Sequence, residues 1–145
     1  VEIKNSNPLR GDAKKTPLKK IELGEIEKLQ LAEQGLNFDS ILPENKVAYL
    51  RENSNISTGG DSVDKTDAVH ESYKKLAVEI TDAMMAKVCG VDLIIPDITE
   101  EINGENYGVI EANFNPMMMM HIYPHQGKSR RLSLDILKML FPEKF

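Results

Sequence analysis

The chain has 145 residues, 41% of them hydrophobic and 28% charged, a length that suits one compact domain rather than two ordinary ones. Its net charge is −5, so it lacks the basic surface with which proteins bind nucleic acid. No apolar run approaches the roughly 18 residues that a membrane span requires, and we expect a cytoplasmic protein with no nucleic-acid or membrane partner.

The first third of the sequence predicts little regular structure. Residues 1–22 are polar and interrupted by proline and glycine, so we expect a loop that is poorly ordered or held by a neighbouring molecule. Apolar residues three apart predict a short helix over residues 24–34, which Gly35 would end. A strand is expected over residues 46–51 and a long polar loop over residues 52–64.

The middle of the chain carries the most regular pattern. Apolar residues with a period of 3.6 predict a helix that Asp67 caps and that extends to Val88. Residues 90–95 and 107–113 predict two strands, whose connection contains a turn at Asn103. These features indicate a hairpin that follows a long amphipathic helix.

The predicted order of elements indicates an α+β fold. A last amphipathic helix is expected over residues 131–141, and Pro142 would end it. The three predicted strands would form an antiparallel sheet, with the long helix and the last helix packed on one face, because an apolar helix face must be buried against another element.

Acidic and amide side chains interrupt the two predicted apolar strands. Asp92 lies in the first strand, and Glu111 and Asn113 lie two positions apart in the second, so the latter two share a face. Strands this apolar should be buried, and buried carboxylates need a partner. The three side chains are oxygen donors that suit Mg²⁺. Alternatively, the acids face solvent or pair with a lysine such as Lys87.

A polar loop with paired glycines is the second candidate site. Its Gly59 and Gly60 could turn N–H groups toward an anion, and the forked guanidinium of Arg51 could bind a phosphate or a carboxylate. The loop lacks the Gly-Lys-Ser/Thr ending of a P-loop. An ordinary surface loop explains the same residues.

The remaining chemically reactive side chains favour structural roles. We expect His121 and His125 to pack or form local hydrogen bonds, and His70 to be solvated. The methionine run at residues 117–120 would fill irregular core space. The single cysteine, Cys89, would be a small buried residue.

Several long segments resemble one family of ligases. The order of the two strands and the last helix is similar to the C-terminal half of ATP-grasp ligases. In particular, the chain resembles the glutathione synthetase part of bacterial bifunctional glutamate–cysteine ligase/glutathione synthetases. The segments that carry the resemblance are NPLRG (7–11), LGEIE (23–27), YLRENSNISTGGDS (49–62), GVDLIIPD (90–97), GVIEANFNP (108–116), HIYP (121–124) and LDILKMLFP (134–142).

The resemblance implies a role for each candidate residue. Asp92, Glu111 and Asn113 would hold one or two Mg²⁺ or Mn²⁺ ions on the phosphates of ATP. Arg51 would be catalytic and would face the transferred phosphoryl group or the acyl phosphate. The loop would line the site for nucleotide and substrates; its candidate binding residues are Asn55, Ser57, Gly59 and Gly60. The implied partners are ATP, γ-glutamylcysteine and glycine.

The resemblance also implies how the chain is organised. We expect one partial domain, in which residues 1–45 form a lead-in segment and residues 46–145 form the C-terminal ATP-grasp subdomain. The chain begins with Val1 rather than Met, and we expect a piece of a longer polypeptide that is inactive without its N-terminal part. The sequence leaves the oligomeric state open, with a homodimer as one option.

Two other functions remain open at this point. A cyanophycin-synthetase-like or other ATP-grasp amino acid ligase has a similar Asn-x-Ser-Thr-Gly-Gly loop. The chain could also be a metal- or nucleotide-binding module without activity of its own. The sequence upstream of Val1 would distinguish these functions.

Overall fold

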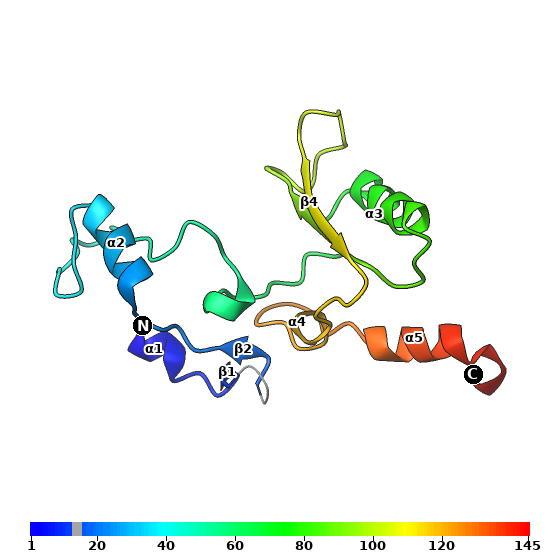
Figure 1. Cartoon of the computed structure of the whole chain (residues 1–145), viewed down its shortest axis with the longest axis horizontal. Coiled ribbons are helices and arrows are strands. Elements are labelled where there is room, and N and C mark those ends of the chain that lie inside the picture. Colours follow the sequence, from blue (N-terminus) through cyan, green and yellow to red (C-terminus); the bar gives the residue numbers. More distant parts are fainter. Residues whose placement is uncertain (13–15) are drawn as a thin grey trace. The chain divides into compact units, whose positions relative to one another are not determined.

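An antiparallel hairpin is the longest strand pairing in the computed structural model, which describes residues 1–12 and 16–145 (Figure 1). Strand β3 (Gly90–Ile94) pairs with β4 (Gly108–Asn113), and Asp92 lies opposite Glu111. A β-bulge interrupts the register directly after Asp92. Both strands agree with the prediction, and the combination of helices with a small antiparallel sheet confirms the α+β class.

The predicted turn between these strands is also confirmed. The Asn103 side-chain oxygen accepts hydrogen bonds from the N–H groups of Glu105 (2.9 Å) and Asn106 (3.0 Å). Gly104 has φ +87°, and a Cβ there would meet no other atom within 4 Å. Asparagine and glycine therefore set this turn by the chemistry that favours them in turns.

Helix α3 (Glu71–Ala83) packs against β3 and supplies the buried residue of this region. Tyr73 is 2% exposed. Its ring meets Tyr107 edge to face with centroids 6.3 Å apart, and its hydroxyl donates to the carbonyl of Asn106 at 3.4 Å. Burial raises the pKa of Tyr73. This one side chain joins the start of α3 to the start of β4.

Both predicted ends of this helix are wrong. The N-cap is His70, whose Nδ1 accepts from the N–H of Ser72 at 3.3 Å, so His70 is a half-buried cap rather than a solvated side chain. At the other end the helix stops at Ala83, because Met85 adopts a left-handed conformation with φ +53°. The periodic pattern of apolar residues continues beyond this point in the sequence, but the helical conformation of the backbone does not.

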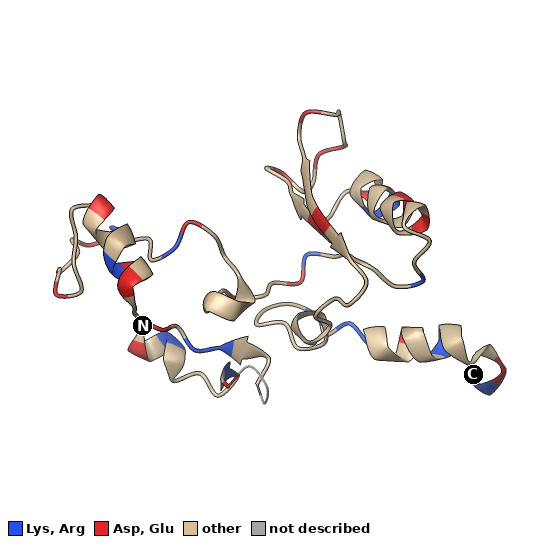
Figure 2. Cartoon of the chain, viewed as in Figure 1, with Lys and Arg blue, Asp and Glu red and all other residues tan. Residues whose placement is uncertain are grey.

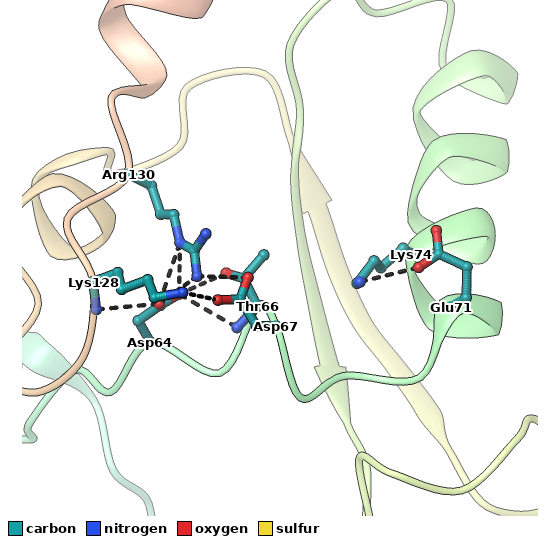
Figure 3. Close-up of polar contacts among 7 residues, drawn as sticks. All are labelled: Asp64, Thr66, Asp67, Glu71, Lys74, Lys128 and Arg130. Atoms are coloured by element: carbon teal, nitrogen blue, oxygen red, sulfur yellow. Dashed lines mark hydrogen bonds and ion pairs between the residues drawn. The ribbon is translucent and has the colours of Figure 1, made fainter.

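Asp67, the expected cap, instead belongs to an ionic cluster (Figure 3). Arg130 donates from Nε and Nη2 to the carboxylate of Asp64, with an Nη2–Oδ2 distance of 2.6 Å, and it also pairs with Asp67. Lys128 pairs with Asp67 at 2.5 Å. Arg130 and Thr66 hold the pKa of Asp64 well below its ordinary value. The cluster therefore joins two loops that lie far apart in the sequence.

A glycine lets the same two loops approach each other. The N–H of Asp64 donates to the carbonyl of Gln126 at 2.8 Å, next to an isolated parallel bridge between Val63 and Gln126. Gly127 has φ +102°, and a Cβ there would lie 2.7 Å from Cβ of Asp64 and 3.0 Å from its carbonyl oxygen. Only glycine satisfies both this backbone angle and this contact.

The C-terminal segment contains two further α-helices. The short helix α4 (Met119–Ile122) includes part of the methionine run, and α5 (Leu132–Leu140) confirms the predicted last helix before Pro142. Met117 and Met119 are exposed, whereas Met118 and Met120 are half-buried. The expectation that the run fills the core is therefore wrong for Met117 and Met119.

Residues 1–62 form a compact unit of their own, and residues 63–145 form the other. The first unit contains α1 (Glu2–Asn5), the parallel pair β1 (Arg10–Gly11) and β2 (Leu18–Lys19), α2 (Glu25–Glu33) and the 3₁₀ helix η1 (Ile56–Thr58). Leu18 and Leu31 are its buried apolar residues. The division of the chain at residues 45/46 stays a prediction about the family's subdomains.

The prediction of a loop over residues 1–22 is wrong for its described part, which contains α1, β1 and β2, and residues 13–15 lie outside the described residues. The Asn5 side chain donates to the carbonyl of Ile21 at 2.9 Å and accepts from its N–H at 2.8 Å. These two hydrogen bonds join the start of the segment to its end, although the segment shows no periodic pattern of apolar residues. A sequence pattern cannot reveal it, because the two residues are far apart.

Residues 46–51 do not form the expected strand. Instead, the Gln34 carboxamide donates to the Tyr49 carbonyl at 2.6 Å and accepts from its N–H at 2.9 Å. The preceding helix α2 ends as predicted, and Gly35 has φ +70°. However, α2 buries Glu27 and Leu31, whereas Ile26 and Leu29 of the expected apolar face are exposed. At residues 46–51, the Gln34 side chain thus makes the backbone hydrogen bonds that a neighbouring strand would otherwise make with Tyr49.

None of the helices among the described residues is long and apolar enough to cross a membrane.

The contact at Gly127 yields a stability prediction. We expect Gly127→Ala to lower the free energy of unfolding by about 1–3 kcal/mol more than Gly104→Ala, because both positions incur left-handed strain but only Gly127 lies against the backbone of Asp64. Urea denaturation of both variants measures the difference. Equal losses would show that the close approach at Asp64 is absent in solution.

Candidate functional site

The three predicted metal ligands lie on one face of the β3–β4 hairpin. Asp92 is opposite Glu111, and Gly90 is opposite Asn113. Positions two apart in a strand share a face, so the two carboxylates and the amide project to the same side. Figure 2 shows acidic residues on β4 and along the connection between the strands. The register therefore brings all three predicted ligands to a common face.

The exposure of these side chains differs from the expectation. Asp92 and Glu111 are exposed, so the predicted burial of both carboxylates is wrong, and the alternative that these acids face solvent agrees with the structure. Asn113 is half-buried, and its Oδ1 atom is buried without a hydrogen-bond partner. A buried amide oxygen without a donor costs free energy that a bound cation would offset.

A glycine shapes the surroundings of Asn113. A Cβ at Gly90 would lie 2.8 Å from Cβ of Pro116 and 3.1 Å from Nδ2 of Asn113. Any other residue at this position would displace the Asn113 amide or the proline. Gly90 therefore lets the amide lie directly against the neighbouring strand.

A cleft of about 660 Å³ opens beside this face of the hairpin. The hairpin contributes Asp92, Glu111 and Asn113 to its lining, and α5 lies across from them with Leu132, Ile136 and Met139. Met117, Met118, Met120 and His121 also line it. Cys89 lines the cleft as a half-buried thiol 3.7 Å from the sulfur of Met84, not as the fully buried residue expected. The cleft combines oxygen donors with an apolar wall.

The three oxygen ligands of the hairpin fit a hard divalent cation that takes its remaining ligands from elsewhere. No cluster of three or more His, Cys, Asp or Glu side chains in residues 1–12 and 16–145 could hold a metal. Asp92, Glu111 and Asn113 supply only two carboxylates and one amide. This set suits Mg²⁺ or Mn²⁺ that takes its remaining ligands from water and phosphate.

In the N-terminal unit, Arg51 is held by a carboxylate of α2. Its Nε lies 2.5 Å from Oε1 of Glu27. The other Glu27 oxygen accepts from the N–H of Gly24 at 2.8 Å. These hydrogen bonds, that of Gly24 foremost, lower the pKa of Glu27. The guanidinium is therefore fixed at one edge by an ionised acid.

The paired-glycine loop folds back on itself. The N–H of Gly60 donates to the carbonyl of Asn55 at 2.8 Å, and that of Gly59 donates to the carbonyl of Ile56 at 3.2 Å. The expectation that these N–H groups turn toward an anion is therefore wrong, because both are used within the loop. The side chains of Asn55 and Ser57 are exposed and available to a ligand.

Arg10 supports this loop, although it was not among the predicted site residues. It is 4% exposed and donates to the carbonyls of Gly59 (2.9 Å) and Lys19 (2.8 Å). It also pairs with the carboxylate of Asp61. Arg10 lies in the NPLRG segment, one of those that carry the family resemblance, and this resemblance is the sequence signal that could have pointed to it. Arg10 therefore fixes the backbone on both sides of Gly60.

The model of the RimK-like ATP-grasp domain matches residues 46–126, more than half of the chain. The chain belongs to the RimK-like ATP-grasp family. The match includes Arg51, the paired-glycine loop and the whole β3–β4 hairpin.

The relatives of this ATP-grasp chain are larger proteins. It is 66% identical over 145 residues to the glutathione biosynthesis bifunctional protein GshAB of Pasteurella multocida, and 53% identical over 147 residues to that of Enterococcus faecalis. Each alignment covers 99% of this chain and 19% of the relative. The chain thus spans about a fifth of the length of the curated relatives it matches.

The structural comparison agrees with the sequence comparison. The crystal structure of a bifunctional glutathione synthetase from Pasteurella multocida matches with a TM-score of 0.81 and 66% sequence identity. The match covers 98% of this chain and 20% of that one. Both units of the ATP-grasp chain therefore have counterparts in a solved ligase.

Arg10 provides a test of the loop's support. We expect Arg10→Met to lower the stability of residues 1–62 by about 3 kcal/mol, because it leaves two carbonyls and Asp61 without their buried donor. Lys4→Met is the control: Lys4 pairs with the same carboxylate at 2.6 Å but is 60% exposed, so the loss should stay below about 1 kcal/mol. Amide hydrogen exchange in residues 1–62 measures both, and equal losses would contradict the proposed support.

Proposed function

We propose that this chain is the C-terminal part of an ATP-grasp ligase module that makes glutathione. The γ-phosphoryl group of ATP would pass to the cysteinyl carboxylate of γ-glutamylcysteine, which gives an acyl phosphate and ADP. The amine of glycine would then attack the acyl carbon, lose a proton and expel phosphate. The family match and the identity to GshAB proteins support this reaction. The proposed location is the cytoplasm.

One observation carries the metal part of the proposal. Asn113 Oδ1 is buried without a donor, on the same face as two exposed carboxylates. Asp92, Glu111 and Asn113 would hold one or two Mg²⁺ or Mn²⁺ ions. A bound ion would offset the negative charge of the ATP phosphates.

The other residues would bind and orient the substrates. Arg51 would place its guanidinium against the transferred phosphoryl group or the acyl phosphate, where fixed positive charge favours charge development. Exposed Asn55 and Ser57 would contact substrate, and buried Gly59 and half-buried Gly60 would hold the loop in shape. Positioning would supply most of the rate gain, as is usual in phosphoryl transfer.

The proposed metal site predicts weak binding of a divalent ion. We expect the 145-residue chain to bind Mn²⁺ loosely, and Asn113→Ala or Glu111→Gln to weaken that binding at least about tenfold, because few donors remain. Glu105→Gln, an exposed acid in the β3–β4 connection, is the control and should not change binding. Titration of the Mn²⁺ paramagnetic resonance signal measures both. Unchanged binding in Asn113→Ala and Glu111→Gln would refute the site.

The proposed ligation predicts that the chain needs the rest of its module. The relatives are about five times longer, and three oxygen donors alone cannot position ATP for in-line transfer, which forfeits effective-molarity gains worth roughly 7–11 kcal/mol. We expect glycine- and γ-glutamylcysteine-dependent phosphate release from an N-terminally extended chain, and none from the 145-residue chain. Release that depends on other amino acids instead would favour a cyanophycin-synthetase-like ligase. No release from either chain would favour a binding module.

A further inference from the structure

A buried carboxylate in the N-terminal unit lies outside the set of residues proposed to bind metal or substrate. Glu27 of α2 is 4% exposed, and it is the one buried carboxylate among residues 1–12 and 16–145. Burying an ionised acid costs several kcal/mol unless its oxygens are paired. The two neighbouring apolar residues of α2, Ile26 and Leu29, are more exposed than this acid. The helix therefore orients its charged residue inward at the expense of hydrophobic burial.

Both oxygens of Glu27 are used. Oε2 accepts from the N–H of Gly24 at 2.8 Å, which fixes the carboxylate at the first turn of α2. Oε1 lies 2.5 Å from Nε of Arg51, a distance typical of a strong, charge-assisted hydrogen bond. The helix start thus anchors the acid, and the acid in turn anchors the guanidinium.

This attachment leaves the other edge of the guanidinium open. Arginine has five N–H donors, and Glu27 uses the one on Nε. In the described part of the chain, the Nη1 and Nη2 atoms of Arg51 have no hydrogen-bond or ion-pair partner, and the side chain is 30% exposed. The terminal fork can therefore donate hydrogen bonds to two oxygens of a phosphate or acyl phosphate.

We propose that Glu27 is a positioning residue for ligation, which holds the Arg51 guanidinium so that its Nη edge faces the phosphoryl group. This inference rests on the proposed function and adds a second residue to it. Glu27 lies in the lead-in segment that precedes the family match at residues 46–126. That segment would then contribute to the chemistry as well as to the fold.

The kinetic test compares variants of the N-terminally extended, glutathione-forming chain. Glu27→Gln keeps an oxygen for the N–H of Gly24 but removes the charge that holds Arg51. We expect kcat to fall about ten- to a hundredfold while KM for ATP stays unchanged, because a small misplacement of a catalytic group slows chemistry rather than nucleotide binding. Glu25→Gln, on the same turn and 85% exposed at its side chain, is the control and should keep full activity.

A rescue experiment separates positioning from a merely structural role. In Arg51→Ala, added guanidinium ion at non-denaturing concentration should restore part of kcat, because Glu27 can bind it. In the double variant Arg51→Ala/Glu27→Gln, the rescue should be lost. Equal rescue in both backgrounds would overturn the proposal.

A measurement without turnover tests the contact itself. In the ¹⁵N spectrum of the 145-residue chain, the Arg51 Nε–H should exchange slowly with water, and in Glu27→Gln it should exchange at least about tenfold faster. Unchanged exchange would overturn the proposal. If Arg51→Ala reduces ligation but Glu27→Gln leaves kcat intact, only this inference fails. If Arg51→Ala leaves ligation intact, the proposed role of Arg51 fails and the inference fails with it.

Discussion

The register of the β3–β4 hairpin is the constraint on which the candidate metal site depends. Because Asp92 pairs with Glu111 and Gly90 pairs with Asn113, all the oxygen donors lie on one face. A shift by one residue would send one strand's side chains to the opposite face. The register also places the glycine, which has no side chain, against the Asn113 amide. The same pairing thus brings the donors together and leaves Asn113 Oδ1 buried without a partner.

Buried charge organises the N-terminal unit more than hydrophobic contact does. Its buried apolar residues are Leu18 and Leu31, whereas Arg10 and Glu27 are buried with hydrogen-bonded partners. Arg10 ties β2 to the paired-glycine loop, and Glu27 ties the start of α2 to Arg51. Removing one partner of such a pair is costly, because it leaves an uncompensated charge. These pairs therefore specify how the segments of residues 1–62 are arranged, although few apolar side chains are buried between them.

Local patterns predicted elements where the decisive contacts are close in sequence. The β3–β4 hairpin, the Asn103 turn, Gly35 after α2 and α5 before Pro142 all agree with the structure. The predicted start of α3 is wrong because the Asp67 side chain forms an ion pair with the distant Arg130 instead of capping the helix. The expected strand at residues 46–51 is absent because the Gln34 side chain occupies the hydrogen-bonding groups of Tyr49. Neither competitor is visible in a local window.

The sequence by itself determined the α+β class, the family and the common face of Glu111 and Asn113, because residue spacing in a strand fixes which side chains share a face. Tertiary structure alone decided that Asp92 joins that face through its pairing with Glu111. It likewise decided that Glu27 and Arg10 are buried partners of the N-terminal site residues. Hydrogen bonds between residues far apart in the chain depend on how segments meet in space. The periodic pattern of apolar residues reports only local structure, so it cannot predict them.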